Sequence, residues 1–417
     1  MKRDWGARED VALEAVAAKE ELAVTEAPSA RDLTPAQWVK ENLFSTPFNS
    51  VLSVVAGLLA GWLLYAVLRW AFGTADWTVV KTNFRLYMIG RFPIEEAWRI
   101  WMGLYYVVLL VGLTWGQAGR RLTWDAMHIV RRSVLAILGV LLLLYLVDSP
   151  LVWSLMGGLV AAYLAGVGVG RIGRGRTMRR IVWAGWLLAF PFVIVVLQIA
   201  DGVGPLRWNG FLLNVLAGVV GIVLSFPIGI VLALGRRSSL PAVRTVCVAL
   251  IEVVRGAPLF AWLLFGVFLL PFLLPPGVQL PQIIRVMIMF TVFSSAYVAE
   301  IVRGGLQGVH FGQYEAARAV GLSTTRMMAL VILPQALRNT IPAMISHFIS
   351  LFKDTSLLAV IGFIDMLRAA RIASASVKFI GSSRQTLLFA ALIFWIVAFS
   401  MSRWSQRLER RLGVGER

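Results

Sequence analysis

Residues 314–334 read YEAARAVGLSTTRMMALVILP and form a polar segment between two long apolar stretches of the chain. The two small alanines that follow Glu315 would let a helix lie close in a groove. We expect Glu315 at the start of this helix, where the helix dipole favours a negative charge. Gly321 should end the helix, because glycine readily adopts the left-handed conformation, and Pro334 should end a second short helix. The segment is therefore predicted to be a helical hairpin between two membrane spans.

The composition around this segment is that of a membrane protein. Of the 417 residues, 59% are hydrophobic and 15% charged, and the mean hydropathy is +0.77. These values exceed those of soluble domains and predict an all-α, polytopic transmembrane helix bundle. The net charge of +18 does not indicate nucleic-acid binding, because Lys and Arg cluster in short loops between apolar segments, where they report topology.

A transmembrane helix needs about 20 apolar residues to cross roughly 30 Å of hydrocarbon. About ten segments meet this requirement, near 51–72, 100–116, 133–148, 151–170, 181–200, 211–234, 245–274, 283–302, 341–362 and 386–403. With a cytoplasmic N-terminus, the inner segments carry 21 Lys or Arg and the outer segments 9. This excess predicts that both termini are cytoplasmic. One predicted outer segment does not follow the rule that Lys and Arg are concentrated in cytoplasmic segments, since it contains Arg368, Arg371, Lys378 and Arg384.

Two details of the spans and their flanks carry further expectations. The segment 245–274 is too long for one crossing, and Glu252 and Arg255 lie three residues apart before Gly256 and Pro258. We expect a helix with a local Glu252–Arg255 pair that kinks or restarts at Gly-Ala-Pro.

Near the N-terminus, Thr34 followed by Pro is predicted to cap a helix. No cleavable signal peptide is expected.

Nothing in the sequence indicates catalysis, a metal site or a cofactor. The single cysteine is Cys247, and the three histidines, at positions 128, 310 and 347, have no ligand spacing. The chain has no Walker A sequence to hold ATP phosphates and no nucleophile elbow. We therefore expect a protein that is not an enzyme.

The hairpin segment resembles the EAA loop of bacterial ABC import permeases. The residues that carry the resemblance are Glu315, Ala316, Ala317, Gly321, Leu333 and Pro334. The resemblance implies short cytoplasmic helices that dock into a cleft on a separate ATPase subunit. ATP hydrolysis would then take place on that partner chain.

Four further stretches resemble polar amino-acid permeases in the order that this family shows them. They are RGAPL at 255–259, with Ala257 where Thr is usual, SAYVAEIVRGG at 295–305, GQ at 312–313, and KDTSL at 353–357. This resemblance covers about 211–404. The extra N-terminal half, with NLFSTPFN at 42–49, is similar to the long permease subunits of general L-amino-acid transporters. The implied division is a cytoplasmic segment 1–50, accessory helices 51–205, a permease core 206–404 with its loop near 304–340, and a basic cytoplasmic tail 405–417.

The KDTSL run supplies the candidates for the substrate pathway. With a span that starts near Ile341, Lys353 would lie near the membrane midplane, where a charge costs about 2.5–3.5 kcal/mol unless it faces a polar cavity or a partner. Lys353 could meet a substrate carboxylate, Asp354 an ammonium group, and Thr355 and Ser356 could supply hydroxyls. Adjacent helical positions diverge by about 100 degrees, so Lys353 and Asp354 cannot both line one wall. Ion pairs between helices are the structural alternative.

The candidates for transmitting movement of the loop to the membrane helices are Arg255, Glu300 and Arg303. Glu300 and Arg303 should lie at the cytoplasmic end of a span beside the loop, as a local pair or as a connection that transmits loop movement.

The function predicted from the resemblance is the transmembrane permease subunit of an ATP-driven importer for L-amino acids, in the inner membrane. Its expected partners are an ATPase dimer, a second related permease, an extracytoplasmic solute-binding protein, lipid and the amino acid. Three alternatives stay open: a permease for another small polar solute such as an osmolyte or chelated metal, an ion-coupled secondary transporter, and a scaffold or receptor without transport. No convincing inverted repeat supports the second. A scaffold would have no reason to place Lys and Asp at the midplane.

Overall fold

The computed structural model describes residues 34–117, 149–173 and 175–412. Within these ranges the chain is helical, with one isolated β-bridge and no strand. It divides at Ala75 into two compact units. The predicted all-α membrane bundle is confirmed.

Eight of the described helices are long and apolar enough to cross a membrane, or nine if one bent pair counts as a span. Nine of the ten predicted spans coincide with these elements. The remaining predicted span, 133–148, lies outside the described residues.

From Thr34 on, the first unit has two α-helices followed by a π turn. Helix α2 (Pro35–Leu43) begins at Thr34, whose side chain accepts a hydrogen bond from the Gln37 backbone N–H at 3.4 Å. The predicted cap is therefore confirmed. Helix α3 (Pro47–Arg69) continues into a π-helical turn, η1 (Trp70–Thr74), and together they form an apolar rod of spanning length.

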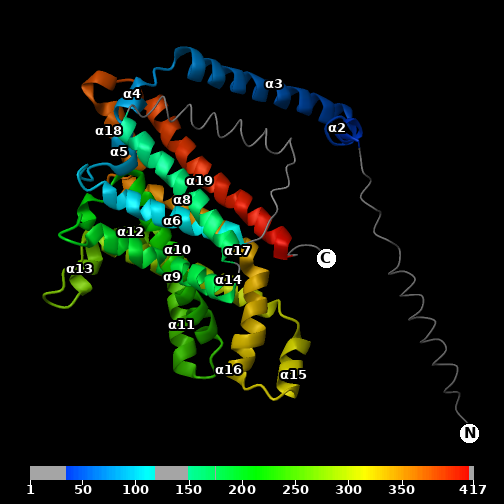
Figure 1. The fold of residues 1–417 in the computed structure, drawn as a ribbon. Helices are drawn as coiled ribbons and strands as arrows, with labels where there is room; N and C mark the ends of the chain where they lie inside the picture. The colour runs from blue at the N-terminus through cyan, green and yellow to red at the C-terminus, as the bar shows by residue number, and fades with distance from the viewer. Residues whose placement is uncertain (1–33, 118–148, 174, 413–417) are drawn as a thin grey trace, which may run out of the picture. The chain divides into compact units, whose positions relative to one another are not determined.

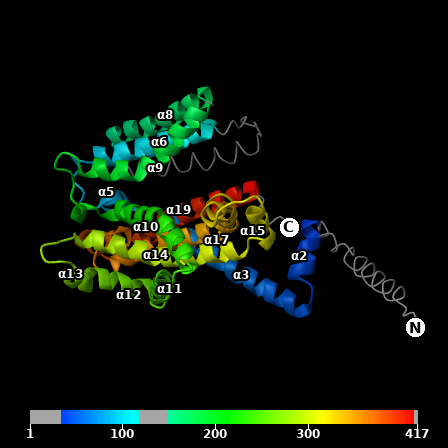
Figure 2. The ribbon, with the colours of Figure 1, turned by 90° about the horizontal axis from the view of Figure 1, so that it is seen from below.

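The second unit begins with two short helices, α4 (Thr78–Thr82) and α5 (Phe84–Ile89), which lead to three long ones. The long helices are α6 (Trp98–Gln117), α8 (Pro150–Ile172) and α9 (Arg176–Gln198). Helix α6 packs along α8 and α9, and the three form a layer beside the other described helices of this unit (Figure 2).

The crossing of α6 and α8 is built on four glycines: Gly112, Gly116, Gly166 and Gly170. A Cβ added at Gly112 would lie 2.4 Å from the Tyr163 carbonyl oxygen, and one at Gly166 would lie 2.5 Å from the Leu109 carbonyl oxygen. These backbone atoms leave no room for a side chain. Glycine is thus required here so that the two backbones can approach, the usual way to pack helices in lipid.

The core of the second unit has four principal helices: α10 (Gly210–Arg236), α11 (Pro241–Arg255), α14 (Gln282–Gln307) and α17 (Leu333–Asp354). Helix α14 packs against the other three and is the most enclosed described span (Figure 1). Side chains such as Leu213, Phe290 and Leu351 fill the space between these helices and are fully buried.

The chain after α11 turns sharply. Helix α11 and the following segment, α12 (Leu259–Leu264), η3 (Phe265–Leu269) and α13 (Leu270–Leu273), meet at 103° across a short break. Gly256 closes α11, and α12 begins after Pro258. The restart predicted at Gly-Ala-Pro is confirmed.

The end of the bundle opposite α15 and α16 is closed by short elements (Figure 1). A 3-10 turn, η5 (Thr355–Ala359), leads to α18 (Met366–Ala375), the 3-10 turn η6 (Val377–Phe379) and the long helix α19 (Ser383–Leu412). Helix α18 packs against α19, α10 and α5, and Tyr87 and Phe389 meet in its apolar cluster with ring centroids 5.1 Å apart.

Candidate functional site

The hairpin predicted at 314–334 begins earlier than expected. Helix α15 (Phe311–Ala319) has Glu315 as its fifth residue and no acidic residue in its first turn. The expectation that Glu315 lies at the helix start is therefore wrong. The helix starts at Phe311 because the His310 ring accepts a hydrogen bond from the Gly312 N–H at 3.1 Å. Sequence reasoning missed this cap, since His is not among the usual N-cap residues.

The turn between the two short helices forms as predicted. Gly321 has φ +78°, and its N–H donates to the Arg318 carbonyl at 2.9 Å. The Leu322 N–H donates to the Ala317 carbonyl at 3.1 Å, which completes a Schellman motif. Ser323 then caps α16 (Thr324–Met327). The short helices therefore have a fixed relative direction set by one glycine.

Pro334 does not end the second helix, so that expectation is also wrong. Helix α16 continues through a π turn, η4 (Met328–Ile332), into α17, and the whole rod from Thr324 to Ala359 has 36 residues. In the π turn the Leu333 N–H bonds the Met328 carbonyl, five residues back. This local shift places Pro334 in the first turn of α17, where a missing N–H is tolerated.

The hairpin residues divide between two faces. Glu315 and Ala316 are exposed, whereas Ala317 is buried in an apolar cluster with residues of α14 and α17. Leu333 is half-buried and Pro334 exposed at the base of α17. The structure thus leaves Glu315 and Ala316 available to a partner and uses Ala317 to hold α15 in place.

An open recess of about 1230 Å³ lies between α15, α16 and the base of α17. Its lining includes three arginines and four carboxamide side chains and no carboxylate: Arg237, Arg318, Arg338, Gln307, Gln313, Gln335 and Asn339. The recess is therefore electropositive and rich in hydrogen-bond donors.

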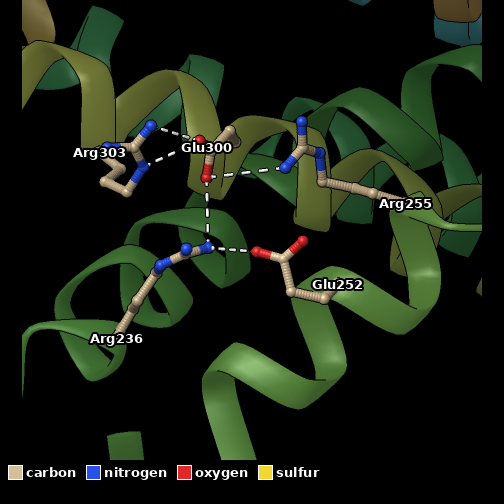
Figure 3. A network of polar contacts seen from close by, with 5 residues as sticks. All are labelled: Arg236, Glu252, Arg255, Glu300 and Arg303. Atoms are coloured by element: carbon tan, nitrogen blue, oxygen red, sulfur yellow. Dashed lines mark hydrogen bonds and ion pairs between the residues drawn. The ribbon is translucent and has the colours of Figure 1, made fainter.

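An ion network joins α10, α11 and α14 close to this hairpin (Figure 3). Glu300 on α14 accepts from Arg303 Nε at 2.8 Å and from Arg236 Nη1 at 3.4 Å, and Arg255 Nη1 lies 3.8 Å away. One carboxylate therefore receives arginines from three helices. The local Glu300–Arg303 pair forms as predicted.

The expected pair within α11 does not form. Glu252 instead accepts from Arg236 Nη1 on α10 at 2.9 Å, while Arg255 turns toward Glu300. Arg255 also lies over the Tyr297 ring, 5.5 Å from its centroid. The two charges of α11 thus act between helices, because opposite charges on α10 and α14 lie within reach.

The Lys353–Ser356 run lies where α17 ends. Helix α17 runs from Leu333 to Asp354, so Lys353 falls in the last turn of the helix. Lys353 is exposed and Asp354 and Ser356 are half-buried, so these three can reach surroundings outside the chain. Thr355 is fully buried, and its hydroxyl donates to the Phe352 carbonyl at 2.7 Å.

Thr355 belongs to a buried polar junction that sequence reasoning missed. Asn214 on α10 donates to Thr355 Oγ1 and to Asp365 Oδ2, each at 3.2 Å, and its carbonyl accepts from the Met366 N–H at 3.0 Å. Asp365 caps α18 by accepting from the Arg368 N–H at 2.9 Å. Burial raises the pKa of the Asp365 carboxyl, and these hydrogen bonds oppose that rise. The junction ties α10, α17 and α18 together.

A second buried polar cluster links the middle of the core helices. Ser294 on α14 donates to Ser225 Oγ on α10 at 2.8 Å, and its oxygen lies 3.0 Å from His347 Nε2 on α17. The His347 ring stacks on Tyr297 with centroids 5.5 Å apart. The sequence gives no indication of this cluster, because its residues come from three segments that lie far apart in the chain. Among the described residues, no group of three or more His, Cys, Asp or Glu side chains could hold a metal ion.

Comparison with known proteins gives concordant matches. Residues 225–414 match the family described as binding-protein-dependent transport system inner membrane component. The glutamate/glutamine/aspartate/asparagine transport system permease protein BztC of Rhodobacter capsulatus is 35% identical over an alignment that covers 90% of this chain and 93% of that protein. The inner membrane amino-acid ABC transporter permease protein YhdY of Escherichia coli is 34% identical, with 91% and 93% covered. A solved amino acid ABC transporter is 32% identical over 48% of this chain and 92% of its own, with a TM-score of 0.43.

Proposed function

This chain belongs to the family of binding-protein-dependent transport system inner membrane components, the permeases of ABC transporters, and from that premise we propose how it works. It is the membrane-spanning permease subunit of an importer for L-amino acids, and it is not itself an enzyme. Its near full-length likeness to two amino-acid permeases supports this substrate class.

The observation that carries the mechanism is the unbroken rod from α16 to η5. Thirty-six residues from Thr324 to Ala359 extend roughly 54 Å at 1.5 Å per residue. The hydrocarbon layer is only about 30 Å thick. One end of the rod therefore projects out of the membrane and carries the hairpin. A movement of the hairpin can therefore pass along one continuous helical segment to the Lys353–Ser356 end.

We propose that the projecting hairpin docks on an ATPase subunit. Glu315 and Ala316 offer an exposed, narrow surface, Ala317 and Gly321 fix the geometry of α15, and Leu333 and Pro334 join the hairpin to α17. ATP binding closes an ATPase dimer, and the rod carries that movement into the helices. The transporter then alternates between inward-facing and outward-facing states, each stabilised by its own ligand.

The complete transporter in this proposal holds this chain, a related permease chain, two ATPase subunits and an extracytoplasmic solute-binding protein. The protein is a multi-pass inner-membrane component, and both termini face the cytoplasm, as the excess of Lys and Arg in the inner segments indicates. Residues 51–205 are accessory to a permease core at 206–404.

The substrate contacts proposed for the pathway lie at the end of α17. The exposed Lys353 ammonium meets the amino-acid carboxylate, and Ser356, three residues further on, supplies a hydroxyl. Asp354 points about 100 degrees away from Lys353 and faces a different side of the pathway. Thr355 holds the end of α17 against α10 through Asn214. Arg255, Glu300 and Arg303 couple the helices around the hairpin when the rod moves.

The test of the docking proposal is Glu315→Lys in the assembled transporter. We expect ATP-dependent amino-acid uptake to be lost and the ATPase to dissociate, while the chain stays inserted with its sister permease. The matched control is Glu95→Lys, the same charge change at an exposed residue before α6. Normal uptake by an assembled Glu315→Lys transporter would refute docking at α15.

A second experiment tests the pathway. Lys353→Met should raise the KM for amino-acid uptake, because the carboxylate loses its cationic partner. Lys378→Met changes another exposed lysine, in the η6 turn, and should leave uptake unchanged. An unaltered KM for Lys353→Met would remove Lys353 from the pathway.

A further inference from the structure

Helix α17 differs from every other described spanning helix in what it exposes. Between Leu333 and Asp354 it has seven exposed positions, all of them polar, small or proline: Pro334, Arg338, Asn339, Ala343, Ser346, Ser350 and Lys353. No large apolar side chain is exposed in this range. Helix α10 by contrast exposes Val223 and Val231, and α19 exposes Leu392 and Trp395.

Five of these positions lie on a single face. Asn339, Ala343, Ser346, Ser350 and Lys353 follow one another at alternating spacings of four and three residues, which is the repeat of one side of a helix. We call these five residues the polar face of α17. Lipid is a poor neighbour for this face, because polar groups in hydrocarbon are costly and lipid-facing surfaces are apolar.

The Asn339, Ser346 and Ser350 side chains of this face have no hydrogen-bond partner in the part of the chain that the structure describes, and Lys353 has the neighbouring Asp354 as its electrostatic partner. Several hydroxyls on other long helices bond their own helix: Thr291 donates to the Met287 carbonyl at 2.9 Å, and Ser400 donates to the Ile396 carbonyl at 2.7 Å. Ser346 and Ser350 make no such bond, and neither does the Asn339 carboxamide. Their donors and acceptors are therefore free for water or a solute.

The polar face also connects two charged regions. Its first residue, Asn339, lines the electropositive recess together with Arg318 and Arg338. Its last residue is the exposed Lys353. A solute that moves along the face would meet donors at both ends and hydroxyls between them, and the positive charges favour a solute with a carboxylate.

We propose that the polar face of α17 is one wall of the water-filled path along which the solute crosses the membrane, and that the recess is the cytoplasmic mouth of this path. The proposal rests on the importer function proposed above and names the surface that carries it. The solute class is a small zwitterion or anion with a carboxylate. A dry contact with another helix fits less well, since it would bury the Lys353 charge and leave the serine hydroxyls unpaired.

The test is cysteine accessibility in the intact transporter. Cys247 is the sole cysteine of the sequence, so Cys247→Ser provides the background for single cysteines at Ser346 and Ser350. Serine and cysteine are nearly isosteric. The matched control is Val223→Cys, in the middle of α10 on a surface that exposes only apolar side chains around it. The probe is a membrane-impermeant methanethiosulfonate.

We expect cysteines at 346 and 350 to react at least about tenfold faster than the one at 223, because only a hydrated thiol forms the reactive thiolate. Modification should block uptake, and the transported L-amino acid should slow the reaction. Reaction as slow as that of Val223→Cys, or modification at both positions without loss of uptake, would overturn the proposal. Asn339→Cys supplies a third position should either serine variant fail to accumulate.

Uptake by the unmodified background transporter separates this proposal from the importer function. If the background transports amino acids while the cysteines stay unreactive, the function stands and the pathway wall is wrong. If the cysteines react but no amino acid is taken up, the polar face is hydrated as proposed, and the proposed class of solute is wrong.

Discussion

The α6–α8 crossing and the α10–α11–α14 junction both join membrane helices, and they do so by different physical means. At α6–α8 four glycines bring two backbones into direct contact, with carbonyl oxygens where side chains would otherwise lie. At α10–α11–α14 the helices are joined by Glu300 and three arginines, with Glu252 beside them.

The difference bears on movement. A glycine contact depends on steep, short-range packing forces and has one arrangement, so helices joined in this way should move as one body. An ion network can exchange partners with small changes in distance, and its charges are only partly buried. The network lies within residues 225–414, which match the permease family, whereas the glycine crossing lies before them, in helices that we propose to be accessory. The comparison therefore predicts a rigid accessory layer beside a core that rearranges.

The largest expected effect comes from breaking the glycine contact. Gly166→Leu places a side chain where a Cβ already lies 2.5 Å from a backbone oxygen, so α6 and α8 must separate. We expect the free energy of unfolding to fall by about 3 kcal/mol, the upper range for overpacking, seen as a lower Tm in detergent. Gly168→Leu, two residues away with no atom within 4 Å, is the control and should leave Tm nearly unchanged. Equal effects of both variants would show that the crossing is not the tight contact.

Breaking the ion network of α10, α11 and α14 should affect uptake as well as stability. Glu300→Gln removes the charge that three arginines share, and because the carboxylate is about one-fifth exposed we expect a loss of roughly 2 kcal/mol. Uptake per folded molecule should also fall, since the coupling between helices is lost. Glu252→Gln, at a half-exposed carboxylate with one partner, should have a smaller effect on both. If Glu300→Gln lowers Tm but leaves uptake per folded molecule unchanged, the network is only structural.

The hydrogen-bonded junction at Asn214 sharpens the comparison, because it joins core helices without an ion pair. Thr355→Val removes one acceptor of the buried Asn214 amide and should lower the free energy of unfolding by about 1 kcal/mol. The KM for uptake should stay the same, and Thr355→Ser should restore stability. A raised KM at unchanged Tm would instead make Thr355 a substrate contact.

The smallest expected effect is the contribution of Asp365 to the pH dependence of Tm. Because burial raises the pKa of this carboxyl above its ordinary value, the folded state holds the proton more tightly than the unfolded state. The stability from this group is present below the unfolded pKa and is lost as pH rises through the folded pKa. Wild-type Tm should therefore decline more than that of Asp365→Asn between acidic and neutral pH. A parallel decline in both proteins would contradict the raised pKa.

Local chemistry explains which features could be predicted from the sequence. The restart at Gly256–Pro258 and the left-handed Gly321 depend on the backbone preferences of two residue types, and both form as expected. Predictions at the helix ends were less successful. The sequence pattern favours Glu315 in the first turn because histidine is not a usual N-cap residue, and it favours a helix end at Pro334 because nothing in the sequence indicates the π turn before it.

Contacts between distant segments were beyond sequence reasoning. The pair expected between Glu252 and Arg255 gave way to partners on α10 and α14, since a charge three residues away competes with charges that folding brings closer. Asn214 and Asp365 are 151 residues apart, and nothing in either neighbourhood indicates that they share a hydrogen bond.

The sequence by itself determined that this chain crosses the membrane many times and carries a permease loop, because apolar length and short motifs are local properties that survive in any fold. Only the tertiary structure decided which charges meet, which of the Lys353–Ser356 side chains are accessible, and which side of α17 remains polar and open. Those outcomes depend on how helices rotate and pack against one another, and that rotation is set by the sum of contacts from segments far apart in the chain.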